Sequence, residues 1–192
     1  MRNLKYFRII NNTEKNIIIN SLSKISPDIS SILNKIEFKL FISFNDSSSK
    51  NNYPFIFLVP NNLIKNINKL THKDINSAGL YFGFIKKNQF FLSIEGAEFL
   101  HNQNLISEKH QICVNENGEK AILYGNKILK KMLIPIEPNM KKNDFLLVFN
   151  RLNELVAIAQ SQVDFEDIQN LKPNECIAIN LVDKGYYLRK KQ

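Results

Sequence analysis

The chain has little of what most catalytic and metal-binding sites require, with three histidines and two cysteines among 192 residues. Cys113 and Cys176 lie far apart and outside any C-x-x-C or Cys/His pattern, so the sequence predicts neither a disulfide framework nor a zinc site. His72, His101 and His110 have no acidic or cysteine partner at catalytic or ligand spacing, and we expect each to be structural. We therefore expect no metal and no cofactor.

Motifs that mark common enzymes and membrane proteins are also missing. There is no G-x-x-x-x-G-K-[ST] loop and no G-x-S-x-G elbow, so nucleotide hydrolysis and acyl transfer lose their usual sequence support. No apolar run approaches the roughly 20 residues of a membrane span, and residues 1–8 lack the apolar core of a secretory signal. These absences predict a soluble, intracellular chain, and we expect a monomer located in the cytoplasm, or in the nucleolus if the source is eukaryotic.

Acidic residues are outnumbered by basic ones. The chain has 26 Lys and Arg against 18 Asp and Glu, which gives a formal net charge of +8 and a pI of about 9.4. This balance favours a polyanionic partner such as nucleic acid or an acidic membrane surface. With 44% hydrophobic and 23% charged residues the chain is typical of a folded protein, and its length suits one large or two small domains.

The first half alternates helical and strand patterns. Thr13 can cap a helix whose Ile18, Leu22 and Ile25 share a face, and a second helix restarts at residues 26–28. We expect further elements as follows: strands at 38–44, 55–59, 78–85 and 89–94, a surface loop at 45–52, and helices at 63–70 and 95–101. Residues 55–59 form a continuous apolar run, which is typical of a central strand buried on both faces.

Two glycines, Gly79 and Gly83, lie in the strand context of residues 78–85 and favour close packing or a bulge. Together these patterns predict an α/β (α+β) N-terminal domain over residues 1–108.

The second half has many short strands. We expect a hairpin of strands 111–114 and 119–123 around a turn at 115–118, followed by a basic helix over 126–132. Further strands are expected at residues 144–149, 155–159, 176–182 and 186–189. Short strands with one helix predict a small, mostly-β barrel, closed or nearly closed, over residues 109–192.

Four segments carry a family resemblance. They are AGLYFGFI at 78–85, FFLSIEGAEFL at 90–100, LYGNKILK at 123–130 and DKGYYLR at 183–189. In combination they resemble the Nip-seven family of ribosome-biogenesis proteins, in its archaeal form, and the last third resembles a PUA domain, an RNA-binding module of pseudouridine synthases and archaeosine transglycosylases. The resemblance implies an α/β domain followed by a PUA domain.

It also implies a function. Such proteins are non-enzymatic RNA-binding factors of large ribosomal subunit biogenesis and pre-rRNA processing, with a preference for single-stranded U- or AU-rich RNA, and their partners are rRNA precursors and other assembly proteins. Two alternatives stay open: a protein–protein adaptor in pre-ribosomes with residual RNA binding, and an accessory protein of RNA modification.

Basic residues of the second half are the candidate RNA contacts. Lys127, Lys130 and Lys131 have spacings that place them on one flank of the expected helix, where a flexible ammonium suits sequence-independent phosphate contact, although a solvated helix face has the same pattern. Cations at strand ends extend the set: Arg151, Lys184, Arg189 and Lys190.

Two further features of the sequence affect where we expect RNA to bind. Tyr186 and Tyr187 lie on opposite faces of the expected last strand, so that one can pack in the core while the other can stack on a base. The segment after residues 155–159 is acidic, whereas some archaeal relatives are basic there. Because Asp164, Glu166 and Asp167 would repel phosphate, we expect the RNA path to shift toward the basic helix and the C-terminus.

Overall fold

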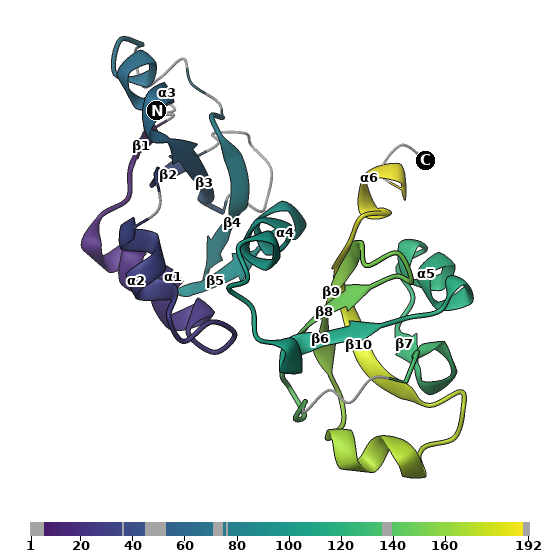
Figure 1. Cartoon of the computed structure of the whole chain (residues 1–192). Coiled ribbons are helices and arrows are strands. Elements are labelled where there is room, and N and C mark those ends of the chain that lie inside the picture. The colour runs from purple at the N-terminus through teal and green to yellow at the C-terminus, as the bar shows by residue number, and fades with distance from the viewer. Residues whose placement is uncertain are drawn as a thin grey trace. The chain divides into compact units, whose positions relative to one another are not determined.

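The computed structural model describes residues 6–35, 37–44, 53–70, 75, 77–135 and 140–189 (Figure 1). Contacts divide the chain into two compact units, Met1–Leu105 and Ile106–Gln192, and each has its own five-stranded sheet. The loop expected at 45–52 lies outside the described residues, as do His72 and Lys190.

The N-terminal unit is built on an antiparallel sheet in which each strand pairs with its neighbour in sequence. The strands are β1 (Tyr6–Ile9), β2 (Phe38–Phe44), β3 (Phe55–Pro60), β4 (Leu80–Lys86) and β5 (Gln89–Leu92). The strands expected from the sequence are confirmed, with shifts of a few residues at their ends. Residues 87–88 join β4 to β5 in a tight turn, whereas helices lie in the chain between β1 and β2 and between β3 and β4.

Both faces of the central strands are buried. Phe41 pairs with Phe57 on one face and Ile42 with Ile56 on the other, and all four are at most 7% exposed. On the first face the ring of Phe7 stacks on that of Phe41, with 5.0 Å between centroids. The prediction of a strand buried on both sides is therefore confirmed for β3.

In the described part of this unit, four helices accompany the sheet: α1 (Asn12–Leu22), α2 (Ile29–Lys35), α3 (Asn61–Ile67) and α4 (Ile94–Asn102). Helix α1 packs against β5, α3 against β3 and α4 against β4. Ser93 caps α4, since its Oγ accepts from the Gly96 amide at 2.9 Å and donates to the Tyr81 carbonyl at 2.7 Å. This bond joins the start of α4 to the sheet.

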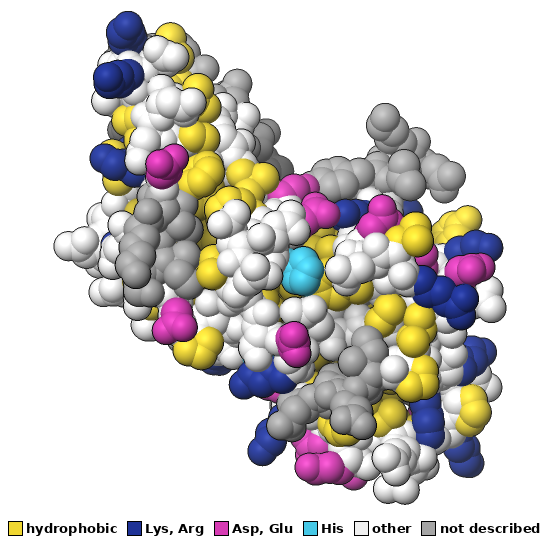
Figure 2. Space-filling model, viewed as in Figure 1, with side chains coloured by type: hydrophobic (Ala, Val, Ile, Leu, Met, Phe, Trp, Pro, Cys, Tyr) yellow, Lys and Arg dark blue, Asp and Glu magenta, His cyan; other side chains and the backbone are white. Residues whose placement is uncertain are grey.

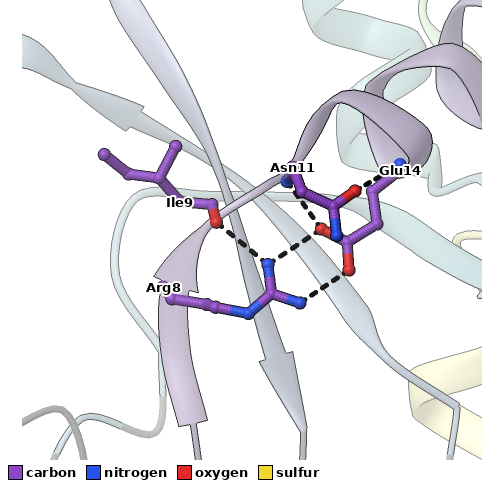
Figure 3. Close-up of polar contacts among 4 residues, drawn as sticks. All are labelled: Arg8, Ile9, Asn11 and Glu14. Atoms are coloured by element: carbon purple, nitrogen blue, oxygen red, sulfur yellow. Dashed lines mark hydrogen bonds and ion pairs between the residues drawn. The ribbon is translucent and has the colours of Figure 1, made fainter.

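The start of α1 differs from the expectation, because the capping residue is Asn11 and not Thr13. Asn11 Oδ1 accepts from the Glu14 amide, and the Glu14 carboxylate accepts from the Asn11 amide, each at 2.8 Å (Figure 3). Arg8 of β1 donates two hydrogen bonds to the same carboxylate, at 2.7 and 2.9 Å. These bonds hold the pKa of Glu14 below its ordinary value, and Glu14 links the strand to the helix.

Gly79, just before β4, and Gly83, within it, have the packing role expected of them. Gly79 has φ +78°, and a Cβ there would lie 2.1 Å from the Leu58 carbonyl oxygen. Gly83 has φ +151° and lies at the bulge where the pairing of β3 and β4 shifts register. A side chain at either position would collide with backbone, so glycine is required for the strand pairing.

The C-terminal unit has a mixed sheet in the order β6-β8-β9-β10-β7. Its strands are β6 (Gln111–Cys113), β7 (Ile128–Leu129), β8 (Phe145–Phe149), β9 (Leu155–Ser161) and β10 (Cys176–Asp183). Strands β6 and β8 are parallel, and the other pairs are antiparallel.

Hydrogen bonds also join the two edges of this sheet. Val114, directly after β6, bridges to Leu133, which follows β7 by a single turn, and the Ile134 amide donates to the Cys113 carbonyl at 2.9 Å. The sheet thereby curls into the small barrel that the sequence predicts, around a core that includes Ile112, Leu146 and Ile177.

Two expected strands of this unit are wrong, and the first is the strand expected at 119–123. Residues expected to form the second half of a hairpin instead form α5 (Glu116–Leu123). Asn115, interpreted from the sequence as a turn residue, is the N-cap, and its Oδ1 accepts from the Gly118 amide at 2.9 Å. Asn favours both turns and helix caps, and the following residues settle the choice because Gly118 and Ile122 are buried one helical turn apart.

The basic helix expected at 126–132 is also wrong. This segment is a turn, the two-residue strand β7 and the 3-10 helix η2 (Lys130–Met132), because Ile128 and Leu129 pair with β10. The strand expected at 186–189 is instead the helical turn α6 (Tyr186–Arg189), so the argument for opposite faces of a strand does not apply to Tyr186 and Tyr187. The described residues of this unit also form two further 3-10 helices, η1 (Glu108–His110) and η3 (Phe165–Asn170).

Candidate nucleic-acid interface

Helix α5 organises the polar surface of the C-terminal unit. It packs against β7, β9, β10 and η2, and its exposed side carries charged residues. In Figure 2 the dark blue Lys and Arg side chains on the α5 and β7 side of this unit lie among hydrophobic side chains and magenta Asp and Glu side chains. Cations interleaved with exposed aromatic side chains are typical of a surface that binds a single-stranded nucleic acid.

The end of α5 is tightly built. Gly125 has φ +84° and donates to the Ile122 carbonyl at 2.7 Å, while the Asn126 amide donates to the Ala121 carbonyl at 3.1 Å. This glycine-based termination satisfies carbonyls that would otherwise lack partners. The Ile122 carbonyl also accepts from Asn180 Nδ2 at 3.0 Å.

Arg189 of α6 closes the same region. Its guanidinium donates two hydrogen bonds of 2.9 Å to the carboxylate of Asp183, which is only 3% exposed, and a third bond to the Leu123 carbonyl. Gly125 and Gly185 both pack against this guanidinium. Arg189 therefore has a positioning role in joining α6, β10 and the end of α5, and its charge is matched by a buried carboxylate.

The other predicted cations divide into those around the ends of α5 and one that is used internally. Lys127 is exposed in the turn after α5, and Lys184 is exposed beside Asp183 in the turn before α6. Lys131 and Arg151 lie near the start of the helix: the Lys131 carbonyl accepts from Asn115 Nδ2, and the Arg151 guanidinium is 3.8 Å from the Glu116 carboxylate. Since Arg151 and Glu116 are both largely exposed, this ion pair stabilises little.

The Lys130 side chain forms hydrogen bonds within the protein. Its Nζ donates to the carbonyls of Gln169 and Leu171, each at 2.7 Å, at the end of η3. A cation there satisfies carbonyls that have no partner within the helix. The expected helix had placed Lys127, Lys130 and Lys131 on one flank. In the structure the Lys130 ammonium bonds to backbone carbonyls, whereas Lys127 and Lys131 are exposed.

The acidic residues that follow β9 also have roles in the local structure. Asp164 precedes η3 and accepts from the Lys142 amide at 2.8 Å, and Glu166 and Asp167 are exposed in the first turn of η3. Carboxylates at the start of a helical segment are favourable because the amide groups there carry partial positive charge. No described contact joins these carboxylates to the cations around α5.

Sequence reasoning missed two residues of this surface, Lys120 and Tyr124. Lys120 was assigned to a strand, whereas it is exposed on α5, and Tyr124 is 77% exposed at the C-cap of the helix. The sequence does contain a pattern that predicts this helix. Asn115 is a favourable N-cap residue and Gly125 a favourable C-terminal stop, and the spacing between them fits a helix of two turns.

Within the described ranges, no three His, Cys, Asp or Glu side chains gather so that they could hold a metal ion. His110 is buried, and its Nδ1 lies 2.9 Å from the Phe145 carbonyl, which is consistent with a structural role. The longest described helix has 11 residues, and none in the described part of the chain has the length and apolar character needed to cross a bilayer.

Comparison with known proteins places this architecture in a family. Residues 7–94 match the "NIP7/UPF0113, pre-PUA domain" model, and residues 110–192 match the "UPF0113 PUA domain" model. The chain belongs to the NIP7/UPF0113 family. The two matches together cover most of the sequence, in the order that the resemblance predicted.

Two relatives illustrate the family's range. A UPF0113 protein of Archaeoglobus fulgidus is 30% identical over 115 residues, which are 60% of this chain and 63% of the relative. The "60S ribosome subunit biogenesis protein nip7" of Schizosaccharomyces pombe is 24% identical over 135 residues, 70% of this chain and 73% of the relative. The conserved PUA domain protein of Thermoplasma acidophilum shares the fold, with a TM-score of 0.62 at 13% identity over 96% of this chain and 98% of that one.

Proposed function

We propose that this NIP7/UPF0113 protein is an RNA-binding factor of large ribosomal subunit biogenesis and acts without catalysing a reaction. The observation that carries the proposal is the pairing of a pre-PUA domain with a PUA domain in one chain, as in a family whose fission yeast member is a 60S ribosome subunit biogenesis protein. The net charge of +8 and the exposed cations around α5 support a polyanionic partner.

In finer terms, we propose that single-stranded U- or AU-rich segments of an rRNA precursor cross the α5 side of the C-terminal unit. Lys127, Lys131, Arg151 and Lys184 contact phosphates there, while Lys130 and Arg189 hold the surface in shape. The chain works as a monomer, alongside other assembly proteins, at the site where ribosomal subunits form in the cytoplasm or nucleolus. The acidic start of η3 lies outside this path, because its carboxylates would repel phosphate.

Direct RNA binding tests the first part. We would titrate the purified full chain against a uridine-rich single strand and a cytidine-rich control from low to physiological salt. We expect tighter binding to the uridine-rich strand and a linear fall of log K with log salt, since released counterions drive the phosphate contacts. Weak binding that ignores the base would refute the proposed preference, and absence of binding would refute the RNA role.

Sedimentation tests the cellular role. In an extract of the source cells, we expect the chain to travel with precursors of the large subunit and to leave that fraction after nuclease treatment. Mature subunits serve as the control. Sedimentation only as free protein would contradict a role in ribosome assembly.

A protein adaptor is the second candidate, and one observation favours it. Ile179 and Leu181 of β10 are 44% and 55% exposed, and large apolar side chains on one strand are typical of a protein interface. Recovery of a defined protein partner after nuclease treatment, lost in an Ile179→Ser/Leu181→Ser variant, would favour this function. Recovery of none would count against it.

A further inference from the structure

Tyr124 is an aromatic side chain held in solvent on a fixed backbone. It is 77% exposed, although its amide donates to the carbonyls of Lys120 and Ala121 and it is the C-cap of α5. The next two residues are fixed as well, because the amides of Gly125 and Asn126 donate back into the helix. An exposed ring on a rigid base suits binding, since little backbone freedom remains to be lost when a partner arrives.

The support beneath this turn comes from distant parts of the chain. The Arg189 guanidinium bonds the Leu123 carbonyl and the buried Asp183 carboxylate, and a Cβ on Gly125 would lie 3.3 Å from it. Asn180 Nδ2 bonds the Ile122 carbonyl. Carbonyls at a helix end ordinarily repel anions. Because the carbonyls of Ile122 and Leu123 already accept hydrogen bonds from Asn180 and Arg189, the end of α5 does not repel a phosphate chain that passes nearby.

Cations lie on both sides of the tyrosine. Lys120 is four residues before Tyr124 and so is on the same face of the helix, and Lys127 is three residues after it in the turn. Both lysines are exposed, and residues 120–127 contain no Asp or Glu. The arrangement of a cation, a ring and a second cation matches the alternation of phosphate, base and phosphate along a single strand.

We propose that Tyr124 is a stacking platform for one unpaired base of a single-stranded RNA, with Lys120 and Lys127 binding the phosphates on either side of it. This inference rests on the proposed function and assigns it a base-contacting residue. The phenol ring stacks on the face of the base, and stacking tolerates any base because every base has a π face. Tyr124 therefore contributes affinity for unpaired RNA, and a preference for uridine has to come from other contacts.

Four variants of the full chain test the platform: Tyr124→Ala, Tyr124→Phe, Tyr124→Trp and the control Leu152→Ala. Leu152 is a suitable control because it is an equally exposed apolar side chain, 79% exposed, in the same unit. Tyr124→Trp adds a reporter, since the chain contains no tryptophan and its single indole would report on contact with a base. The probe is a labelled uridine-rich single strand, and a second probe carries abasic positions.

We expect Tyr124→Ala to weaken binding about ten-fold, with an unchanged salt dependence, because a ring contact is lost while the phosphate contacts stay. Tyr124→Phe and Leu152→Ala should bind as the parent does, and the fluorescence of Tyr124→Trp should be quenched by the RNA. On the abasic probe, Tyr124→Ala and the parent should bind equally. An unchanged melting temperature in each variant would show that the fold is intact.

The outcomes separate this inference from the function on which it rests. If the parent binds RNA and Tyr124→Ala binds as tightly, the platform is refuted and the RNA-binding function stands. If the parent binds no RNA, the function fails and the platform with it. If Tyr124→Ala loses a protein partner and keeps its RNA affinity, the ring belongs to a protein interface and the inference is overturned.

Discussion

Single side chains of similar type do different things in this protein. Lys130 and Lys127 are three residues apart, yet Lys130 bonds two carbonyls at the end of η3 while Lys127 is exposed in a turn. Arg189 is likewise used inside the fold, against Asp183. Charge by itself therefore does not identify the residues that are available to RNA.

This difference gives the first prediction. Lys130→Gln should lower the free energy of unfolding by roughly 1 kcal/mol, because two charge-assisted bonds to carbonyls are lost. Lys127→Gln should change stability by less than about 0.5 kcal/mol, since it is a surface substitution, and should flatten the salt dependence of RNA binding by about 0.7 in slope. Denaturant titration and salt-dependent RNA binding measure the two effects, and the reverse assignment would contradict the structure.

The second prediction concerns the Glu14 carboxylate. Bonds from Arg8 lower its pKa, so its contribution to stability is complete above the pKa of an unfolded glutamate, about 4.3, and is lost as pH falls through the lower folded value. At neutral pH, Glu14→Gln should lower the free energy of unfolding by about 1 kcal/mol, through the partly exposed ion pair and the cap.

In acid the parent and the Glu14→Gln variant should converge. Denaturation midpoints at neutral and acid pH test this. Glu37→Gln, which alters an exposed carboxylate of the same unit, should match the parent throughout. A Glu14→Gln deficit that persists unchanged in acid would mean that the charge of Glu14 is not the cause.

Among the elements, α5 determines where the candidate interface lies. Gly118 lets it approach the barrel, because a Cβ there would be 2.8 Å from the Met132 Cβ and 3.1 Å from the Val114 Cβ. Its N-cap Asn115 and its C-terminal Gly125 set its length. These three positions place Lys120 and Tyr124 on the outer face.

The third prediction follows from this packing. Gly118→Ala should destabilise the protein by roughly 1–3 kcal/mol, because the added methyl overpacks the contact with Met132, even though alanine favours a helix by about 1 kcal/mol over glycine. Asn117→Ala, at the exposed neighbouring position, should leave stability unchanged or slightly higher. Thermal unfolding of the two variants tests this prediction. A Gly118→Ala protein that is more stable than the parent would refute the close contact between Gly118 and Met132.

At the level of the whole molecule, the chain consists of two compact units with separate sheets and separate cores. The family models match one part of the chain each, at 7–94 and 110–192. We propose the boundary between two domains after residue 108, within η1.

The fourth prediction tests that boundary. Fragments 1–108 and 109–192, expressed separately, should each fold and unfold cooperatively, since a domain has its own hydrophobic core. A cut after residue 118, inside α5, should yield an unfolded C-terminal fragment. Dispersed amide spectra report folding, and aggregation of both fragments from the first cut would argue for one cooperative unit.

Local sequence patterns were sufficient where partners are near in sequence. Strands β2 to β5, the helices of the N-terminal unit and the strands β8, β9 and β10 were predicted, because apolar periodicity and turn residues are properties of short segments, whereas β1 was not predicted. The family assignment, the net positive charge and the expectation of a PUA barrel likewise came from the sequence alone.

Only the tertiary structure decided the elements and side chains that depend on distant residues. Ile128 and Leu129 form a strand because β10 is there to pair with them, and α5 forms where the barrel buries Gly118 and Ile122. The partners of Lys130 and Arg189 lie about 40 and 66 residues away in sequence, respectively. Sequence thus determined what this protein is built from and which family it belongs to, whereas long-range pairing decided which of its cations and aromatic rings face solvent.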